Sequence, residues 1–370
     1  MKICHVTSAH KTNDGRIFLK ECTSLAKNRN NDVYLVGQGV SRTENNVKVV
    51  GIGEMPARRL QRMLLFSKAV VKKAGSIDAD IYHLHDPELL RHALSLKKRG
   101  ARVIFDSHEN ILESIDEKTY MAKPIRTIAK LYYAGLQRRV FPKLDAVVVV
   151  SPQMIETYSK YNNSVVMITN YPIVDKQALI DSVGEQKGAI VFAGGISPQW
   201  SIMEIIQAIH ANKDLHLYIY GSADQDYLSK LKNSEYADSF TYGGILPFTE
   251  IQQRIRESEM VVALLKPGKN TFFHEGTLGN TKLFEAMLNG KPVIATDFEL
   301  WKKIIQEKGC GICVDPADNK KIAEAINTIH SMTNTERKQI GNNGRREVLD
   351  NYNWQVEENK LNELYNNLSK

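Results

Sequence analysis

The sequence GNTKLFEAMLNGKPVIATD at residues 279–297 decides the fold of the second half of the chain. A polar turn precedes a short amphipathic run with Lys282 and Glu285, Gly290 follows that run, and an apolar segment comes next at 292–297. This order predicts a helix that a glycine ends and a buried parallel strand directly after it. Because the first N–H groups of a helix attract phosphate, the helix start is a candidate anion site. An ordinary capped helix with a surface lysine and glutamate is the alternative.

Short β-branched runs alternate with longer amphipathic segments on both sides of this stretch, which is typical of parallel sheets with crossover helices. We expect strands at residues 2–8, 32–39, 80–86, 102–109, 145–151, 164–170, 189–195, 215–221, 240–244, 260–266 and 292–297. The polar segment 171–188 interrupts the alternation and is the predicted linker. The fold class is therefore α/β, with two doubly wound, Rossmann-like domains at 1–170 and 189–351 that bind ligands at the carboxyl ends of their strands.

The composition is that of a soluble globular protein, since 42% of the 370 residues are hydrophobic and 25% are charged. No apolar stretch is long enough to span a bilayer or to form a signal peptide core, so we expect a cytoplasmic protein. The net charge of +7 predicts an anionic partner and leaves open a phosphorylated metabolite, a nucleic acid or an anionic lipid. Four cysteines are too few for a disulfide framework, and Cys310 and Cys313 have no second ligand pair nearby.

Motifs over most of the chain resemble those of the family-4 glycosyltransferases. KLFEAMLNGKPVIATD (282–297) is similar to the family's nucleotide-sugar signature, while HKTNDGRIFLKECTSLA (10–26), YHLHDPELL (82–90) and FDSHEN (105–110) are similar to its N-terminal motifs. The resemblance implies a retaining enzyme of the GT-B fold, with two Rossmann-like domains that face a cleft. It also implies that a C-terminal helix at 352–370 crosses back to the N-terminal domain.

The resemblance places the sugar-nucleotide donor in the C-terminal domain. There Lys282 and the helix start would hold the diphosphate, Glu285 would accept hydrogen bonds from the ribose, and the loop at 243–245 would flank the base. The donor-side residues carried over in this way are Gly195, Gly243, Gly244, Ile245, Lys266, Asn280, Thr281, Lys282, Leu283 and Glu285.

The sequence departs from the family pattern at three positions of this site. Thr277 stands where the family's first glutamate is usual, and Gly195 and Trp200 stand near the usual arginine and lysine. Charge accumulates on the leaving diphosphate during transfer, so a working enzyme needs another cation there. The replacements that the sequence offers are Lys282, Lys266 and Lys269.

On the acceptor side, the resemblance gives His108 a catalytic role at the end of the strand that precedes it. Asp106 or Glu109 is expected to orient its ring. His10, Asp14, Arg16 and His85 are further acceptor-side candidates, although Asp14 in the turn Asn-Asp-Gly also suits a purely structural role.

We predict no metal or other cofactor. The Asp-Ala-Asp sequence at 78–80 matches a metal-binding pattern of a different glycosyltransferase fold, but it directly precedes a strand and lies far in sequence from the donor signature. We interpret it as the polar start of that strand.

Two basic segments, at 56–75 and 123–143, each combine six Lys or Arg with apolar residues and no acid. They suit an anionic membrane surface or a lipid diphosphate, with ordinary amphipathic crossover helices as the alternative. The expected function is hexosyl-type transfer from a nucleoside-diphosphate sugar to a cell-surface glycan or a lipid-linked acceptor, in polysaccharide biosynthesis at the inner face of the plasma membrane and without nucleic acid. A non-catalytic GT-B partner subunit and a sugar-nucleotide epimerase are the alternatives.

Overall fold

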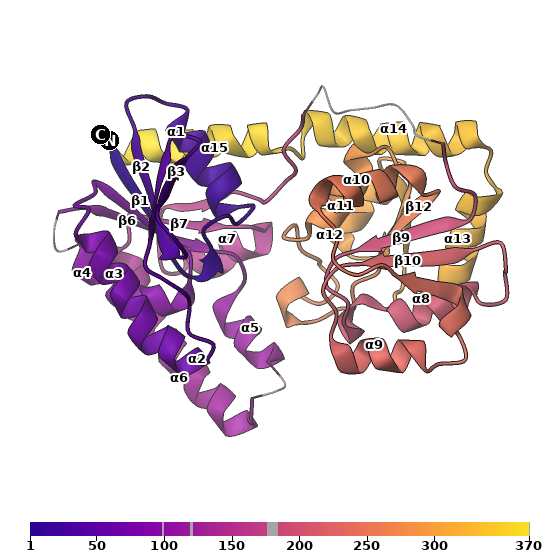
Figure 1. Cartoon of the computed structure of the whole chain (residues 1–370), viewed down its shortest axis with the longest axis horizontal. Helices are drawn as coiled ribbons and strands as arrows, with labels where there is room; N and C mark the ends of the chain where they lie inside the picture. Colours follow the sequence, from indigo (N-terminus) through magenta and orange to yellow (C-terminus); the bar gives the residue numbers. More distant parts are fainter. Residues whose placement is uncertain (98–99, 119–120, 176–183, 370) are drawn as a thin grey trace. The chain divides into compact units, whose positions relative to one another are not determined.

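The computed structural model describes residues 1–97, 100–118, 121–175 and 184–369. The chain forms two compact units (Figure 1). One comprises Met1–Asn170 together with Trp354–Lys370, and the other comprises Tyr171–Asn353. Part of the predicted linker, residues 176–183, lies outside the described residues.

The N-terminal unit is built on a sheet with the strand order β3-β4-β2-β1-β5-β6-β7-β8. Its strands are β1 (Lys2–Lys11), β2 (Asp32–Gln38), β3 (Arg42–Glu44), β4 (Val47–Gly51), β5 (Ile81–Leu84), β6 (Arg102–Ser107), β7 (Ala146–Val149) and β8 (Val165–Met167). All neighbouring strands are parallel except β3 and β4. Strands such as β5 and β7 are buried along their whole length, because helices cover both faces of a parallel sheet.

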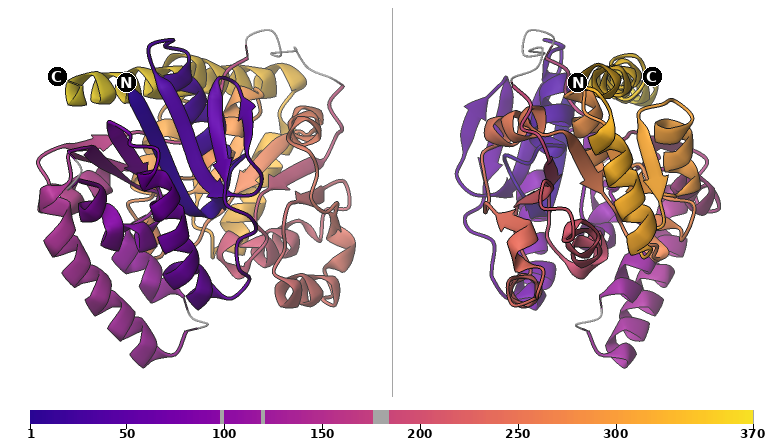
Figure 2. Two further views of the ribbon diagram at one scale, coloured as in Figure 1. Left: turned by 60° about the vertical axis from the view of Figure 1, so that its left-hand side comes forward. Right: turned by 90° about the vertical axis from the view of Figure 1, so that its right-hand side faces the viewer.

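The helices of this unit connect its strands and lie on both sides of the sheet (Figures 1 and 2). They are η1 (Ile17–Cys22), α1 (Thr23–Ala26), α2 (Arg59–Gln61), η2 (Arg62–Phe66), α3 (Ser67–Gly75), η3 (Pro87–Leu89), α4 (Leu90–Lys97), α5 (Ile111–Glu117), α6 (Lys123–Val140), η4 (Phe141–Lys143), α7 (Pro152–Ser159) and α15 (Trp354–Leu368).

Helix α15 returns to the N-terminal unit from the end of the other one. Trp354, Leu361 and Tyr365 pack into the same apolar core as Ile3 and Ile17. The Trp354 indole N–H also donates to Ser24 Oγ at 2.8 Å. The core of this unit is therefore assembled from segments at opposite ends of the sequence.

The second unit contains a parallel sheet with the order β11-β10-β9-β12-β13-β14. Its strands are β9 (Ala189–Ala193), β10 (His216–Tyr220), β11 (Phe240–Tyr242), β12 (Met260–Ala263), β13 (Val293–Thr296) and β14 (Gly311–Val314). The chain runs outward from β9 through β10 to β11, and then returns to the other side of β9 for β12 to β14. This reversal makes the carboxyl ends of β9 and β12 the topological switch point, where doubly wound sheets bind ligands.

The helices of the second unit again cover both faces of its sheet (Figure 2). They are η5 (Pro198–Trp200), α8 (Ile202–Ile209), α9 (Gln225–Lys232), η6 (Ala237–Ser239), α10 (Phe248–Glu257), η7 (Lys269–Thr271), α11 (Thr281–Leu288), α12 (Glu299–Trp301), η8 (Lys302–Gln306), α13 (Asn319–Ser331) and α14 (Asn334–Asp350). None of the described helices has the length and the apolar character required to cross a bilayer.

Each strand segment expected from the sequence contains a strand, but three strands were not predicted. Strands β3 and β4 form a hairpin around Asn45 and Asn46, both with positive φ. Asparagine tolerates this conformation better than most residues, so an Asn-Asn pair between short polar runs is a weak turn signal. The third missed strand, β14, has only four residues, and three of them are half-buried because it lies at the edge of the sheet.

Candidate functional site

Three loops meet at the carboxyl end of the second sheet. Gly194 N–H donates to Tyr220 O at 2.8 Å, and Gly221 N–H donates to Gly244 O at 2.7 Å, so the loops after β9, β10 and β11 lie side by side. A Cβ on Gly243 would lie 2.4 Å from the Tyr220 ring, which requires glycine there. The predicted donor-side glycines thus gather at one edge of this sheet.

Lys282 reaches the switch point of the same sheet from the first turn of α11. Its ammonium lies 3.9 Å from the Trp200 ring centroid and 5.6 Å from that of Phe192. A Cβ on Gly194 would lie 1.9 Å from Lys282 Cε, so a larger residue there would displace the end of this side chain. Burial lowers the pKa of Lys282 to about 8. No carboxylate of the described residues forms an ion pair with it, which leaves a partly desolvated cation at a ligand-binding position.

The start of α11 is capped by its own chain. Asn280 Oδ1 accepts a hydrogen bond from Lys282 N–H at 3.1 Å, so one of the N–H groups predicted for a phosphate is already used. The Leu283 side chain is fully buried and can offer a ligand only its backbone N–H. An anion at this helix start would therefore have fewer free N–H groups to bind than the sequence alone indicates.

Glu285 lies one turn further along α11, toward α10. Gln252 Nε2 donates to Glu285 Oε2 at 2.9 Å. The loop with Gly244 and Ile245 leads directly into α10, and the Ile245 side chain is exposed. The predicted ribose and base contacts therefore border the same short segment of the second unit.

Lys266, a predicted donor-side cation, is paired with an acid of its own unit. Its ammonium lies 2.6 Å from Glu204 Oε1, so much of its charge is neutralised within the protein. Thr277, in place of the family's glutamate, has a structural role: its carbonyl accepts from the Trp301 indole N–H at 2.7 Å. Lys282, unlike Lys266, has no carboxylate partner among the described residues.

The N-terminal unit contains a cavity of about 650 Å³ next to the carboxyl ends of β1, β5 and β6. The strand ends supply polar lining residues, among them His10, His85, Asp86, Asp106, His108 and Glu109. Helices α2, α5 and α6 and the π-helical segment η2 supply apolar lining residues, among them Leu60, Met63, Ile111, Ile115, Ile125 and Tyr133. The cavity is thus amphipathic, with acid–base groups on the sheet side and hydrocarbon on the helix side.

His108 lines this cavity, and Asp106 lies within hydrogen-bonding distance of its ring. His108 Nε2 lies 3.1 Å from Asp106 Oδ2. Glu109 was the other candidate for this role, but its carboxylate accepts from the Ser114 hydroxyl instead. Burial would raise the pKa of Asp106, but the Arg16 guanidinium outweighs burial and holds that pKa well below its usual range. Asp106 is therefore a permanent anion that fixes the imidazole.

His10 lies beside His108, with their ring centroids 5.1 Å apart. His10 Nδ1 lies 3.0 Å from Asp86 Oδ1, and Ser8 N–H donates to Asp86 Oδ2 at 2.6 Å. Burial opposes ionisation of Asp86, yet these partners keep its pKa below the usual range. The same carboxylate raises the pKa of His10 against the effect of burial. Two histidines, each held by a buried aspartate, thus line one cavity.

Arg16 and Asp14 have structural positions rather than the predicted acceptor-side ones. Arg16 makes two 3.0 Å hydrogen bonds to Asp106 and is buried. Asp14 Oδ1 accepts from the N–H groups of Arg16 and Ile17. Neither is among the lining residues of the cavity. The sequence does not reveal that Arg16 supports Asp106, because the two residues are 90 positions apart.

Sequence reasoning also missed the buried group behind the cavity. His5 pairs with His83 in the register of β1 and β5, and His85 follows on the same face. The sequence does contain a sign of this group. YHLHD has histidines at alternate positions, which lie on one face of a strand, and ICHV of the neighbouring strand adds a third histidine. Glu21, which completes the group, comes from η1 and had no such signal.

Comparisons with known proteins agree with this architecture. A family described as Glycosyltransferase Family 4 matches residues 16–171, and one described as Glycosyl transferases group 1 matches residues 176–347. A search of curated protein sequences finds no significant match.

Several solved structures share the fold at low sequence identity. Sucrose-phosphate synthase from Thermosynechococcus elongatus superposes with a TM-score of 0.76 at 15% identity, over 100% of this chain and 99% of that one. HepE from Anabaena, in complex with UDP and glucose, gives 0.70 at 15% identity over 99% and 100%. A glycosyltransferase from Rickettsia africae gives 0.68 at 16% identity over 100% and 98%.

Two Rossmann-like units, with a terminal helix that returns to the first, define a GT-B protein. The two family matches follow one another along the chain and together leave only short segments unmatched. The chain belongs to the family-4-like glycosyltransferases.

Proposed function

We propose that this glycosyltransferase moves a sugar from a nucleoside-diphosphate sugar to a lipid-linked acceptor during the synthesis of a surface glycan, with retention of anomeric configuration. The amphipathic cavity of the N-terminal unit is the observation that carries the acceptor assignment. A lipid-linked saccharide presents a polar reacting end and a hydrocarbon chain, and the cavity offers acid–base side chains and an apolar wall to match.

The second unit supports a diphosphate donor. Lys282 is a cation without a carboxylate partner among the described residues, and glycines keep the backbone open around it. Binding of a leaving diphosphate would satisfy this charge and stabilise the negative charge that grows in the transition state. In this proposal Lys282 does that work, and no metal is needed at the diphosphate. UDP in the HepE structure makes UDP sugars the first donors to test.

Apolar side chains on α6 support a membrane-bound acceptor. Ile128 and Leu131 are 68% and 69% exposed, and Ile125 is also exposed at the rim of the cavity. Leu60 and Leu65, on α2 and η2, are similarly exposed. An ordinary crossover helix buries its apolar face, so these exposed residues fit better with insertion into a bilayer at the cavity mouth.

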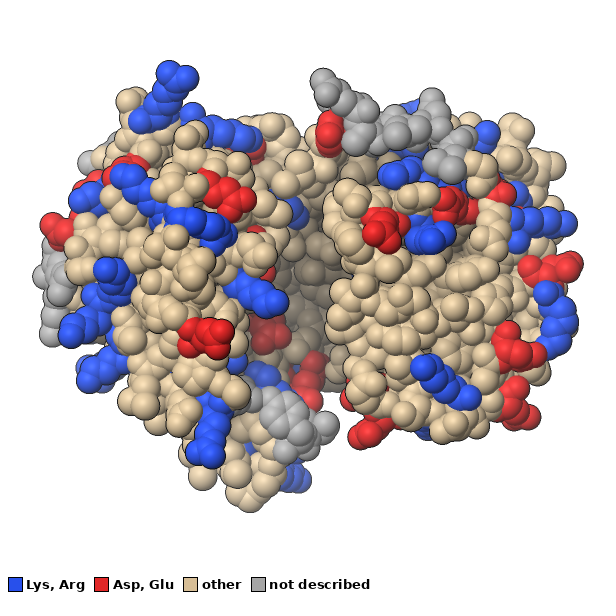
Figure 3. Space-filling view, viewed as in Figure 1, with Lys and Arg blue, Asp and Glu red and all other residues tan. Residues whose placement is uncertain are grey.

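Basic side chains accompany this apolar surface. Figure 3, viewed as Figure 1, shows Lys and Arg among mostly uncharged atoms over the lower part of the N-terminal unit, where α2 and α6 lie. Arg126 and Lys130 on α6 contact Asp116, but the helix has no acid of its own. The combination fits an anionic membrane surface on which the enzyme is peripheral.

A donor screen with and without acceptor tests the proposal. Nucleoside diphosphates are compared by thermal shift, since a ligand that binds the folded state raises Tm. The matching sugar nucleotide is then incubated with detergent-dispersed lipid acceptors, and nucleotide release is measured. Release that requires a lipid acceptor is expected. Binding without release would favour a non-catalytic subunit, and donor conversion without any acceptor would favour an epimerase.

Vesicle sedimentation tests the membrane part separately. Binding should be stronger to vesicles with anionic lipid than to neutral ones, and should weaken with salt because surface attraction is screened. Replacing both Ile128 and Leu131 with Ser should release the protein, whereas the same change at exposed Val40 and Ile173 should not. Equal binding to both kinds of vesicle would contradict the proposal.

A further inference from the structure

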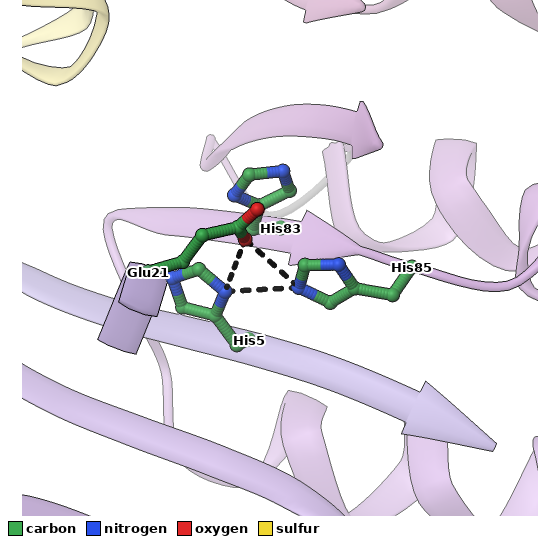
Figure 4. Close-up of side chains that lie close together, drawn as sticks. All are labelled: His5, Glu21, His83 and His85. Atoms are coloured by element: carbon green, nitrogen blue, oxygen red, sulfur yellow. Dashed lines mark hydrogen bonds and ion pairs between the residues drawn. The ribbon is translucent and has the colours of Figure 1, made fainter. Parts of the chain in front are cut away.

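A group of four buried side chains lies behind the cavity of the N-terminal unit. His5 comes from β1, His83 and His85 from β5 and the residue after it, and Glu21 from η1 (Figure 4). All four are almost completely shielded from solvent. Burial of a carboxylate among three imidazoles requires an explanation, because ionised and polar groups lose hydration there.

Three atoms of this group form a triangle that suits a metal ion. His5 Nδ1 lies 2.9 Å from His85 Nε2, and Glu21 Oε2 lies 3.7 Å and 3.8 Å from these two atoms (Figure 4). Ligands 2.0–2.1 Å from a tetrahedral Zn²⁺ are separated by about 3.3–3.4 Å. The observed separations bracket this value. His83 also has a ring nitrogen within 4.8 Å of the other ligand atoms, which makes it the nearest candidate for a fourth position.

Each of the three ligands has its other polar atom held by a neighbour. His85 Nδ1 lies 3.4 Å from Asp106 Oδ2, and His5 Nε2 lies 3.2 Å from Tyr365 Oη. Glu21 Oε1 lies 3.1 Å from Arg16 Nε. Such outer partners fix the tautomer and direction of metal ligands.

A hydrogen-bonded group without metal explains the arrangement less well. The contact between His5 and His85 is then an ordinary hydrogen bond, and Glu21 Oε1 has its ion-pair contact with Arg16, but Glu21 Oε2 remains buried without a hydrogen-bond donor among the described residues. Arg16 serves Asp106 and Glu21 together, so two carboxylates share one guanidinium. A cation bound between these three atoms would coordinate Glu21 Oε2. It would also neutralise the carboxylate charge that the single guanidinium leaves uncompensated.

We propose that His5, His85 and Glu21 bind a divalent transition metal ion of the Zn²⁺ type. The ion joins β1, η1 and the end of β5 and stiffens the support of Asp106, which orients His108. It does not touch the reacting sugar. Because His85 and Asp106 also line the cavity, the ion has a short route from solvent. This inference departs from the sequence prediction that the chain binds no metal.

Metal analysis of the full-length protein tests the inference without any substrate, so its outcome is independent of the proposed function. Protein purified without chelator is expected to contain about one zinc per chain, and chelator-treated protein should take up one Zn²⁺ with a rise in Tm. Co²⁺ in its place should give the visible spectrum of a low-coordinate site.

Variants locate the ion. Glu21→Gln should abolish stoichiometric uptake, whereas His274→Gln, at an exposed histidine of the second unit, should retain it. If Glu21→Gln does not fold, Tyr365→Phe removes only the hydroxyl beside His5 and should weaken Zn²⁺ binding at least about tenfold. Wild-type protein that holds no zinc and takes up none after reloading would overturn the inference. Equal uptake by wild type and by the folded variant would also overturn it.

Discussion

The carboxyl ends of the two sheets differ in whether their charged side chains are paired. In the N-terminal unit the histidines and aspartates at the strand ends are paired within the protein: His10 has Asp86, His108 has Asp106, and Asp106 has Arg16. In the second unit Lys282 lies against the Trp200 and Phe192 rings and beside Gly194, with no carboxylate paired to it among the described residues. The first arrangement suits groups that must be held in one orientation, and the second suits a charge that a ligand is to neutralise.

The largest expected effect concerns the paired side of this comparison. Asp106→Asn removes the two hydrogen-bonded carboxylate oxygens from the buried Arg16 guanidinium and leaves it only the contact with Glu21 among the described residues, so the free energy of unfolding should fall by about 3–5 kcal/mol. Asp32→Asn is the matched control, because Asp32 and its partner Lys48 are 42% and 49% exposed, and it should cost less than about 1 kcal/mol. Urea unfolding measures the free energy of unfolding of both variants. Equal losses would show that the buried Arg16–Asp106 pair contributes no more to stability than the exposed Lys48–Asp32 pair.

The next effect concerns the unpaired lysine. Lys282→Met keeps the apolar stem over Trp200 and deletes the charge, so folding should survive while turnover falls by about a hundredfold or more. Lys303→Met, at an exposed lysine of the same unit, should leave the rate unchanged. A Lys282→Met rate within about threefold of wild type would move the role to Lys266 or Lys269.

A smaller effect is expected at Glu285, the predicted ribose contact. Glu285→Ala should weaken UDP binding by about 1.5–3 kcal/mol, the usual range for a hydrogen bond to a charged group. Glu250→Ala removes an exposed glutamate on the neighbouring helix α10 and serves as the control. Calorimetry measures the affinity of wild type and of both variants for UDP. A Glu285→Ala variant that binds UDP as tightly as wild type would remove Glu285 from the donor site.

The smallest effect is a pH dependence of UDP binding. The pKa of Lys282 in the free protein is lowered to about 8, so the lysine is charged at pH 7 and mostly neutral at pH 9. An anion binds the charged form, and the affinity for UDP should therefore fall roughly tenfold between these two pH values. The Lys282→Met variant should lack this step. A wild-type affinity that stays constant from pH 7 to 9 would show that UDP does not contact this ammonium.

The sequence was sufficient for the fold class because parallel strands and crossover helices leave a periodic apolar pattern, visible in runs such as AIVFA (189–193) and AVVV (146–149). The place of His108 directly after a strand is likewise visible in the sequence, while its catalytic role stays a prediction. Contacts between distant segments were not predictable in this way. The sequence predicts Arg16 as an acceptor-side residue, whereas in the structure it supports Asp106. It predicts Lys266 as a donor-side cation, whereas Lys266 pairs with Glu204. Such pairings depend on the register of whole elements, which no local pattern encodes.

Helix α15 imposes an order on biosynthesis. Tyr365 contacts His5 and His83, and Trp354 and Glu358 contact Ser24 and Lys27. On the ribosome, residues 1–170 emerge first, yet the helix that completes their core emerges only after all of residues 171–353. We therefore expect the unit that is translated first to reach its final packing last. Until then the apolar side chains around Leu25 and Ile17 lack the packing that α15 provides, and we expect a nascent chain paused before residue 354 to bind chaperones.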